Sequence, residues 1–273
     1  MIKKILIFTL LTIFSFSSTI NATELLNDEE PKNTKVYVGG GFFYKPTYEG
    51  SSSRRSLWIP VAGIKYEDRT RNFFNAFNFY GPQASLTIFN NNEFKFDLFA
   101  EYEFGRQNGD DNSLRILEEI DPHFSVGTNI EYSLPYDFSI SYEFQTDVDD
   151  FYSESYTSDF AINYNKNIWI TFTQPLVNTT SFSTSYANSD YLNEWFGTPA
   201  NEMYKYYKPS SDFYKMSLSN SLIMPFSEKI VGVIDFSYDR LIGEAADSQL
   251  IKKQGSPNQF SLMFTVMYEF YSF

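Results

Sequence analysis

The stretch FKFDLFAEYEF, at residues 94–104, decides the fold of this chain. Its even-numbered positions are all apolar, whereas its odd-numbered positions carry Lys95, Asp97, Glu101 and Glu103, with Phe99 as the exception. Alternation with a period of two predicts a β-strand whose side chains point to opposite faces of a sheet. One face of this strand is therefore apolar and the other is charged.

The same alternation recurs along the chain, for example at 124–134, 138–145 and 260–270. It predicts about twelve strands. We place them at residues 35–48, 56–67, 72–80, 83–90, 93–105, 122–134, 137–147, 156–165, 167–174, 213–224, 229–241 and 259–273. Tyr271 and Phe273 have the opposite parity to the apolar face of the last strand. Either that strand ends at Phe270 or a β-bulge intervenes.

The connections between these strands alternate between short and long. One side has short turns such as Asn91-Asn92 and Pro135-Tyr136. The other side has long polar loops at 106–121, 148–155, 175–212 and 242–258. Short periplasmic turns and long extracellular loops are typical of outer-membrane barrels. The sequence therefore predicts an all-β protein, an antiparallel transmembrane β-barrel of about twelve strands, in preference to a secreted β-sandwich.

In such a barrel the polar face lines the lumen, because polar side chains are costly in hydrocarbon. The inward-facing charged residues are predicted to be Lys95, Asp97, Glu101, Glu103, Glu131, Glu143, Asp159, Asp235, Asp239 and Glu269. Most of these are acidic, so a conducting lumen would favour cations.

The composition supports this fold and excludes several functions. Aromatic residues make up 19% of the chain, and they suit strands and interfacial girdles. The net charge of −13 argues against a nucleic-acid partner. With no cysteine and one histidine, the chain has no thiol catalysis, disulfide or two-histidine metal site. We expect no cofactor.

The N-terminus reads as an export signal. Lys3 and Lys4 precede an apolar stretch from Ile5 to Ser17, and Ala22 precedes a polar segment. This pattern predicts a signal peptide at 1–22, in preference to a membrane anchor. An acidic periplasmic segment at 23–34 and the barrel at 35–273 then follow.

Residues with possible chemistry are few. His123 lacks a recognisable catalytic partner motif, so a structural role is favoured over that of a general base. The acidic clusters Asp110-Asp111, Glu118-Glu119 and 147–150 lack the spacing of a calcium loop and read as solvated loops. Gly39-Gly40-Gly41 lies inside a strand, which favours a close backbone approach over a phosphate loop.

Three segments together resemble the MipA/OmpV family of outer-membrane proteins. They are residues 46–50 (PTYEG), 191–197 (YLNEWFG) and 238–248 (YDRLIGEAADS), and the third is the most specific. The resemblance extends from about residue 36 to 273, and it departs from the family at Trp195 and Gln249. The matching motif residues are Pro46, Tyr48, Gly50, Phe196, Gly197, Tyr238, Asp239, Arg240, Leu241, Gly243, Ala245, Ala246, Asp247 and Ser248.

The resemblance implies a non-enzymatic scaffold that links the outer membrane to peptidoglycan-remodelling enzymes, and it brings no catalytic residues. Its implied partners are a lytic transglycosylase and a penicillin-binding protein, besides outer-membrane lipid, lipopolysaccharide and the barrel-assembly machinery. A small porin-like channel for cationic or neutral solutes and a surface adhesin remain the alternatives. For Arg240 we expect a pairing with Asp239, Glu244 or Asp247 that folds the last loop inward as a partial plug, in preference to contact with surface sugar phosphates.

Overall fold

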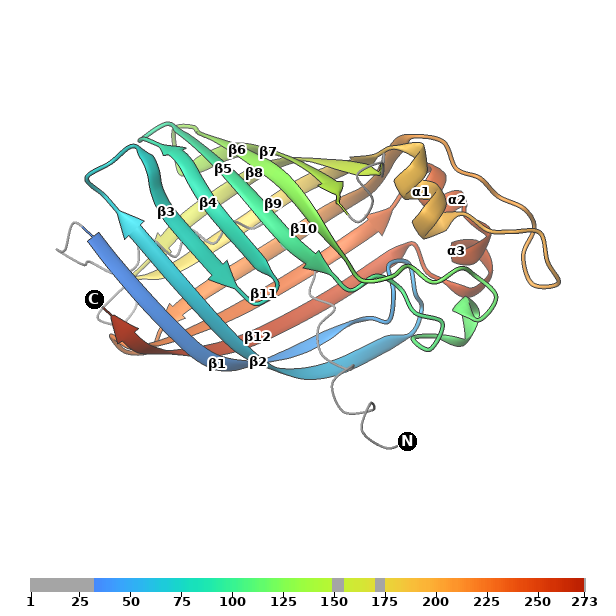
Figure 1. The fold of residues 1–273 in the computed structure, drawn as a ribbon, viewed down its shortest axis with the longest axis horizontal. Helices are drawn as coiled ribbons and strands as arrows, with labels where there is room; N and C mark the ends of the chain where they lie inside the picture. The colour runs from blue at the N-terminus through green and yellow to red at the C-terminus, as the bar shows by residue number, and fades with distance from the viewer. Residues whose placement is uncertain (1–31, 149–154, 170–174, 273) are drawn as a thin grey trace.

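Twelve antiparallel strands form a closed barrel in the computed structural model, which describes residues 32–148, 155–169 and 175–272 (Figure 1). Each strand pairs with its neighbours along the chain, and β1 pairs with β12 to close the barrel. The strands are β1 (Lys32–Pro46), β2 (Arg54–Asp68), β3 (Phe73–Tyr80), β4 (Gln83–Asn90), β5 (Phe94–Glu103), β6 (His123–Ser133), β7 (Phe138–Asp147), β8 (Tyr156–Ile168), β9 (Leu176–Ala187), β10 (Asp212–Pro225), β11 (Ile230–Leu241) and β12 (Asn258–Ser272). The short helices are η2 (Asn112–Leu114), α1 (Ser189–Phe196), α2 (Gly243–Asp247) and α3 (Gln249–Gln254).

The predicted all-β barrel is confirmed, with one strand misplaced. The strand predicted at 167–174 is wrong, because β8 continues to Ile168 and β9 spans Leu176–Ala187, inside the predicted loop 175–212. β9 reads LVNTTSFSTSYA, and its many hydroxyl side chains resemble those of a loop. Residues 170–174 lie outside the described part of the chain, as do the predicted signal peptide 1–22 and residues 23–31 of the acidic segment.

The two faces of the strands differ in burial as the alternation predicts. On β5, Asp97 and Glu101 are buried while Leu98 between them is 40% exposed. On β12, Thr265 and Glu269 are buried while Phe264 is exposed. The charged residues therefore point into the lumen and the apolar residues point outward, toward lipid.

A β-bulge in β12 explains why Tyr271 has the opposite parity to the apolar face of this strand. Tyr37 of β1 pairs with Glu269, whereas the preceding Val36 pairs with Tyr271, so Phe270 is the extra residue. The bulge reverses the parity beyond it. Phe270 and Tyr271 are consequently both exposed, and both add to the aromatic rim at this end of the barrel.

The chain approaches its own backbone closely in β1. A Cβ atom on Gly39 would lie 2.0 Å from the backbone oxygen of Val266 in β12. Glycine at this position lets the first and last strands pair without a clash, as expected for the Gly39-Gly40-Gly41 run.

The two ends of the barrel differ in the length of their connections. The end that holds the start of β1 and the end of β12 has connections of seven residues or fewer, between Asp68 and Phe73, Asn90 and Phe94, Ser133 and Phe138, Ile168 and Leu176, and Pro225 and Ile230. Three long connections, 104–122, 188–211 and 242–257, lie at the other end together with the shorter connection 47–53 and with α1, α2 and α3 (Figure 1). By the loop asymmetry of such barrels, the short end is periplasmic and the long end is extracellular. Among the described residues, no helix has the length and apolar character needed to cross a membrane.

Candidate functional site

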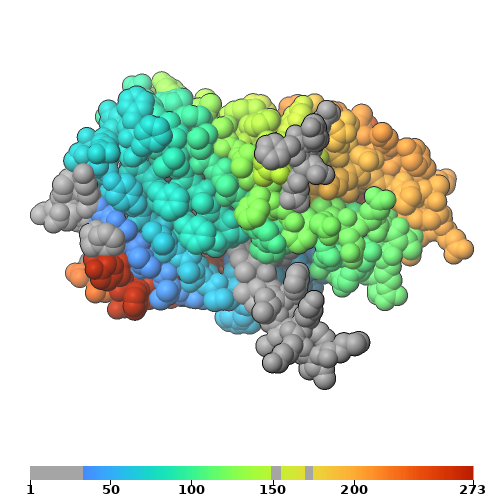
Figure 2. All heavy atoms as spheres, in the orientation of Figure 1, coloured from blue at the N-terminus to red at the C-terminus, as the bar shows by residue number. Residues whose placement is uncertain are grey.

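The long connections do not extend freely into solvent but pack on one another. We call the resulting layer the cap, and it comprises the four connections 47–53, 104–122, 188–211 and 242–257 together with the adjoining strand ends. Its buried apolar residues are Tyr48, Leu114, Leu117, Ala187, Leu192, Phe196, Tyr204, Tyr214, Leu241, Ala245, Leu250 and Ile251. Because β5/β6 and β11/β12 are on opposite sides of the barrel, their connections can share a core only across its mouth. Figure 2 shows part of the cap, with connection 104–122 in green against connection 188–211 in orange.

Two buried tyrosines tie three of the connections together through Ser113. The hydroxyls of Tyr48 and Ser113 are 2.9 Å apart, and the Tyr204 hydroxyl donates to the Ser113 carbonyl at 2.9 Å. Burial raises the pKa of Tyr204 to about 12 and also raises the pKa of Tyr48. Both phenols are therefore neutral at physiological pH and can donate hydrogen bonds in this apolar layer.

Arg106 is a buried cation in the cap. Its guanidinium donates to the carbonyls of Trp195 at 2.5 Å, Glu194 at 3.3 Å and Glu118 at 3.3 Å. Burial lowers its pKa to about 10, so Arg106 stays charged at neutral pH. Two of these carbonyls belong to the last turn of α1, where a positive charge interacts favourably with the helix dipole. Arg106 thus fixes α1 over the mouth of the barrel.

Three of the motif residues shape the cap backbone. Gly50 (φ 92°) and Gly243 (φ 51°) adopt the left-handed region that favours glycine. A Cβ on Gly50 would lie 2.1 Å from the Cδ1 atom of Ile251, and one on Gly243 would lie 2.0 Å from the Asp212 carboxylate. Ser248 caps α3 through the Leu250 amide at 3.2 Å and donates to the Phe196 carbonyl at 2.6 Å.

The remaining motif residues lie in or beside the same layer. Tyr48, Phe196, Leu241 and Ala245 belong to its buried core, and Ala246 packs against that core. Pro46 ends β1, Gly197 follows α1, and Asp247 ends α2. Tyr238 and Arg240 point outward from β11 while Asp239 points into the lumen. The structure therefore brings three distant segments, 46–50, 196–197 and 241–248, into one layer.

The predicted pairing of Arg240 is wrong. Arg240 is exposed on the outer face of β11, and its guanidinium lies 3.5 Å from the Asn258 side chain. Glu244 instead accepts a hydrogen bond from Tyr207 at 2.5 Å, and Asp247 pairs with Lys252 at 2.8 Å. The reason is parity, because an arginine next to the inward-facing Asp239 must face outward.

Several of the acidic loop residues have internal partners, among them Glu119, which accepts from the Asn108 amide at 3.0 Å. Asp110 pairs with Arg55 at 2.9 Å. Asp111 caps η2 by accepting from the Ser113 amide and hydroxyl, both at 2.9 Å. Burial raises the pKa of Asp111, but the hydrogen bonds from Ser113 outweigh that effect and leave the pKa below its ordinary value. These carboxylates therefore fix the loop rather than lying freely in solvent, whereas residues 149–150 of the third cluster lie outside the described segments.

Beneath the cap the lumen contains a cavity of about 220 Å³. Its charged lining consists of Lys45, Glu49, Arg55, Glu103, Glu143, Asp147, Asp159, Lys215 and Asp239, that is, six carboxylates and three cations. Lys215 pairs with Glu49 at 3.1 Å. The excess of negative charge attracts cations to this space.

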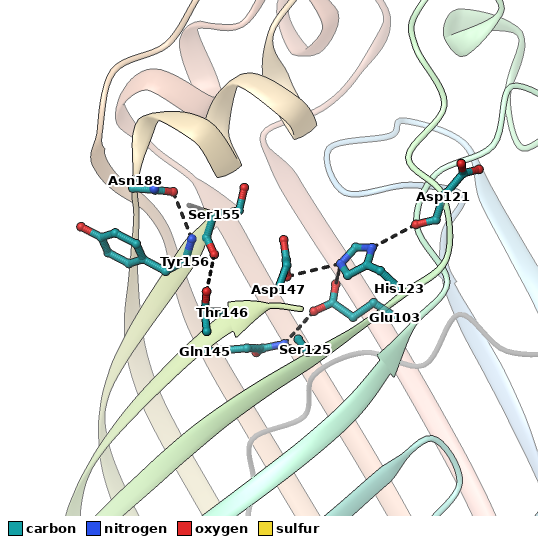
Figure 3. Close-up of polar contacts among 10 residues, drawn as sticks. All are labelled: Glu103, Asp121, His123, Ser125, Gln145, Thr146, Asp147, Ser155, Tyr156 and Asn188. Carbon is teal, nitrogen blue, oxygen red and sulfur yellow. Dashed lines mark hydrogen bonds and ion pairs between the residues drawn. The ribbon is translucent and has the colours of Figure 1, made fainter. Parts of the chain in front are cut away.

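His123 lies at the edge of this cavity with two acidic partners (Figure 3). Its Nε2 atom is 3.3 Å from Asp147 Oδ1 and 3.8 Å from Glu103 Oε2, and its Nδ1 atom is 2.9 Å from the Asp121 carbonyl oxygen. The three residues sit at the outer ends of β5, β6 and β7. Sequence inspection missed the partners because they are far from His123 in the chain, although pairing the predicted strands in antiparallel order would have placed Glu103 beside His123.

A closed barrel with an apolar outer face, a charged lumen and unequal connections defines a β-barrel protein of the bacterial outer membrane. The model of the MipA family, MltA-interacting protein, matches residues 38–270. The chain belongs to the MipA family. No curated protein matches the sequence.

Several solved structures are similar to this chain at low identity. A bacterial polysaccharide outer membrane secretin is 9% identical with a TM-score of 0.41, covering 87% of this chain and 99% of that chain. The NanC porin is 10% identical with a TM-score of 0.39, covering 85% of this chain and 98% of that chain. The translocator domain of the autotransporter NalP from Neisseria meningitidis is 9% identical with a TM-score of 0.36 and covers 91% of both chains.

Proposed function

We propose that this protein is a non-enzymatic outer-membrane anchor for a peptidoglycan-remodelling enzyme of the lytic transglycosylase class. The family description names an interaction with MltA, and a penicillin-binding protein is the second proposed partner. The observation that carries the proposal is the cap, because an apolar core packed across the mouth is suited to a closed barrel and unsuited to steady transport.

The periplasmic end has a small surface with exposed aromatic side chains that such a partner could bind. Tyr136, in the turn between β6 and β7, is 87% exposed, and Trp169, after β8, is 68% exposed. Exposed aromatic side chains are the residues that most often anchor protein interfaces. The interfacial girdle of the membrane uses the same residue types, so a partner and the lipid surface share this rim.

Capture of the enzyme tests this proposal. The full-length barrel, purified in detergent, is expected to retain a purified lytic transglycosylase of the MltA type. Tyr136→Ser should weaken the retention, whereas Tyr206→Ser should not, since Tyr206 is 68% exposed in the cap at the opposite end. Failure of the wild-type barrel to retain the enzyme would remove the scaffold role.

The acidic cavity favours a second candidate, a cation-preferring channel that conducts when the cap opens. In planar bilayers we expect the wild-type protein to show no steady conductance. A steady cation-selective current would instead favour the channel over the anchor.

Contacts with the surrounding membrane are part of the same proposal. Arg54 and Arg240 lie near the outer ends of β2 and β11, where Arg54 donates to the Phe260 carbonyl at 2.6 Å. Exposed guanidinium groups suit the phosphates of lipopolysaccharide. Export through the signal peptide 1–22 and recognition of the C-terminal aromatic residues by the barrel-assembly machinery complete the proposal.

A further inference from the structure

The tautomer of His123 decides what its cluster can bind. The Asp121 carbonyl oxygen, 2.9 Å from Nδ1, can only accept a hydrogen bond, so Nδ1 carries the hydrogen. In a neutral imidazole the Nε2 atom then has a lone pair, and this lone pair faces the carboxylates of Glu103 and Asp147. Three electron-rich atoms in one place require a cation between them, which is either a proton on Nε2 or a metal ion.

The surroundings of the cluster resemble the outer shell of a metal site. Histidine ligands usually donate their second ring N–H to a carbonyl or carboxylate, as Nδ1 does here. The Gln145 amide donates to Glu103 Oε1 at 2.6 Å, which fixes that carboxylate and leaves Oε2 facing His123. Gln145 is itself held near Ser125, whose hydroxyl lies 2.5 Å from the same amide nitrogen. The ligand atoms of His123 and Glu103 are therefore oriented by partners of their own.

The distances fit a small tetrahedral ion. Metal–ligand bonds of about 2.0–2.1 Å place neighbouring ligand atoms of a tetrahedral zinc site ~3.3 Å apart. The observed separations from Nε2 are 3.3 Å to Asp147 and 3.8 Å to Glu103, and all three ligand atoms lie within 4.8 Å of one another. The limit of 4.8 Å exceeds the ideal separation by about 1.5 Å, so side-chain movements of that size or less would bring the ligand atoms into range.

We propose that Glu103, His123 and Asp147 bind a divalent metal ion of the zinc class. One nitrogen and two oxygen donors match zinc and its neighbours better than calcium, which takes six to eight oxygen ligands. Glu103 and Asp147 line the acidic cavity, so the fourth position of the ion is open toward the lumen. The excess of carboxylates in that cavity concentrates cations near the site.

Titration of the full-length barrel with zinc chloride tests the site. The folded protein in detergent at pH 7 is expected to bind one zinc ion per chain in a calorimetric titration. His123→Ala and Asp147→Asn should each weaken this binding at least ~100-fold, and Gln145→Ala should weaken it about 10-fold, because it removes only an orienting contact. Asp239→Asn is the matched control, since Asp239 lines the same cavity outside the cluster and should change binding less than about threefold.

Cobalt provides a readout that needs no variant. Bound to the wild-type protein, Co²⁺ should show the intense visible absorption of tetrahedral coordination, and an equimolar amount of Zn²⁺ should abolish it. The proposal is overturned if the wild-type protein binds neither metal at 100-fold molar excess, in which case a proton bridges the cluster. It is equally overturned if Asp239→Asn weakens binding as much as Asp147→Asn does, because the cavity charge alone would then hold the ion.

Discussion

Replacement of Arg106 by methionine should loosen the cap while the barrel persists. Methionine keeps much of the length and apolar character of the side chain but donates no hydrogen bond. The change leaves the carbonyls of Trp195, Glu194 and Glu118 without the guanidinium that they share in the native layer. Since two of them end α1, that helix is the element expected to come free.

The magnitude follows from the contacts. Hydrogen bonds to charged groups contribute about 1.5–3 kcal/mol each, and they are not additive when they share one donor group. With one short and two long contacts, we expect the opening free energy of α1 to fall by about 3 kcal/mol. A loss of this size raises the open population by roughly two orders of magnitude.

Amide hydrogen exchange of the segment 189–197 measures this opening directly. Exchange in Arg106→Met should accelerate by about 100-fold, and Arg106→Lys should fall between the mutant and the wild type, because an ammonium lacks the forked geometry. Arg240→Ala is the matched control, since the Arg240 side chain points outward from β11 toward Asn258, and it should leave the exchange unchanged. Wild-type exchange rates in a folded Arg106→Met barrel would show that the apolar core alone holds α1, and would refute the reasoning.

Three further predictions concern topology, the lipid face and pH. A protease site inserted at Gly109 should be cleaved by protease added to intact cells, whereas one inserted at Asn91 should not. The reverse result would show that the barrel has the opposite orientation in the membrane. Leu98→Arg should lower the free energy of unfolding in lipid vesicles by about 2–4 kcal/mol, because Leu98 faces lipid. Ser217→Arg should lower it much less, because Ser217 faces the cavity. Equal losses would contradict the assignment of the two faces. The carboxylate of Asp111 stabilises the cap above its ordinary pKa of 3.8, and this contribution is lost as the pH falls through the lower folded-state pKa. The protection factors of segment 112–114, which compare each exchange rate with that of an unstructured amide at the same pH, should therefore fall below about pH 3.8 in the wild type and stay constant in Asp111→Asn.

The fold was accessible from sequence because each strand has its pattern within ten or so residues. β5 was expected at 93–105 and spans Phe94–Glu103, since its alternation is nearly complete. The sequence did not predict β9, because Ser181, Ser183 and Ser185 line the lumen and give this strand the composition of a loop. Apolar alternation identifies a strand only where lipid covers one face and the other face carries recognisable charges.

The cap could not be derived in the same way. Arg106 and Trp195 are 89 residues apart, and Tyr204 and Ser113 are 91 apart, so no local period connects them. The resemblance to a known family did point to segments 46–50 and 238–248 at the outer ends of two predicted strands, but it did not show that the two segments meet. The order of strands in the barrel explains their proximity, because β1 and β11, which lead into these two segments, both pair with β12.

The cap also depends on the barrel that carries it. Its core uses side chains from four connections, and none of these connections could bury its apolar residues alone. The pairing of β1 with β12 brings the connections after β1 and before β12 side by side, where Ser51 bridges Gly255. Bringing such distant segments together costs chain entropy, and this cost is largely offset once the strands have closed the barrel and placed the connections near one another. A folded cap therefore requires a closed barrel, whereas the twelve-stranded barrel does not require the cap. Because of this asymmetry, Arg106→Met can open the cap without unfolding the barrel.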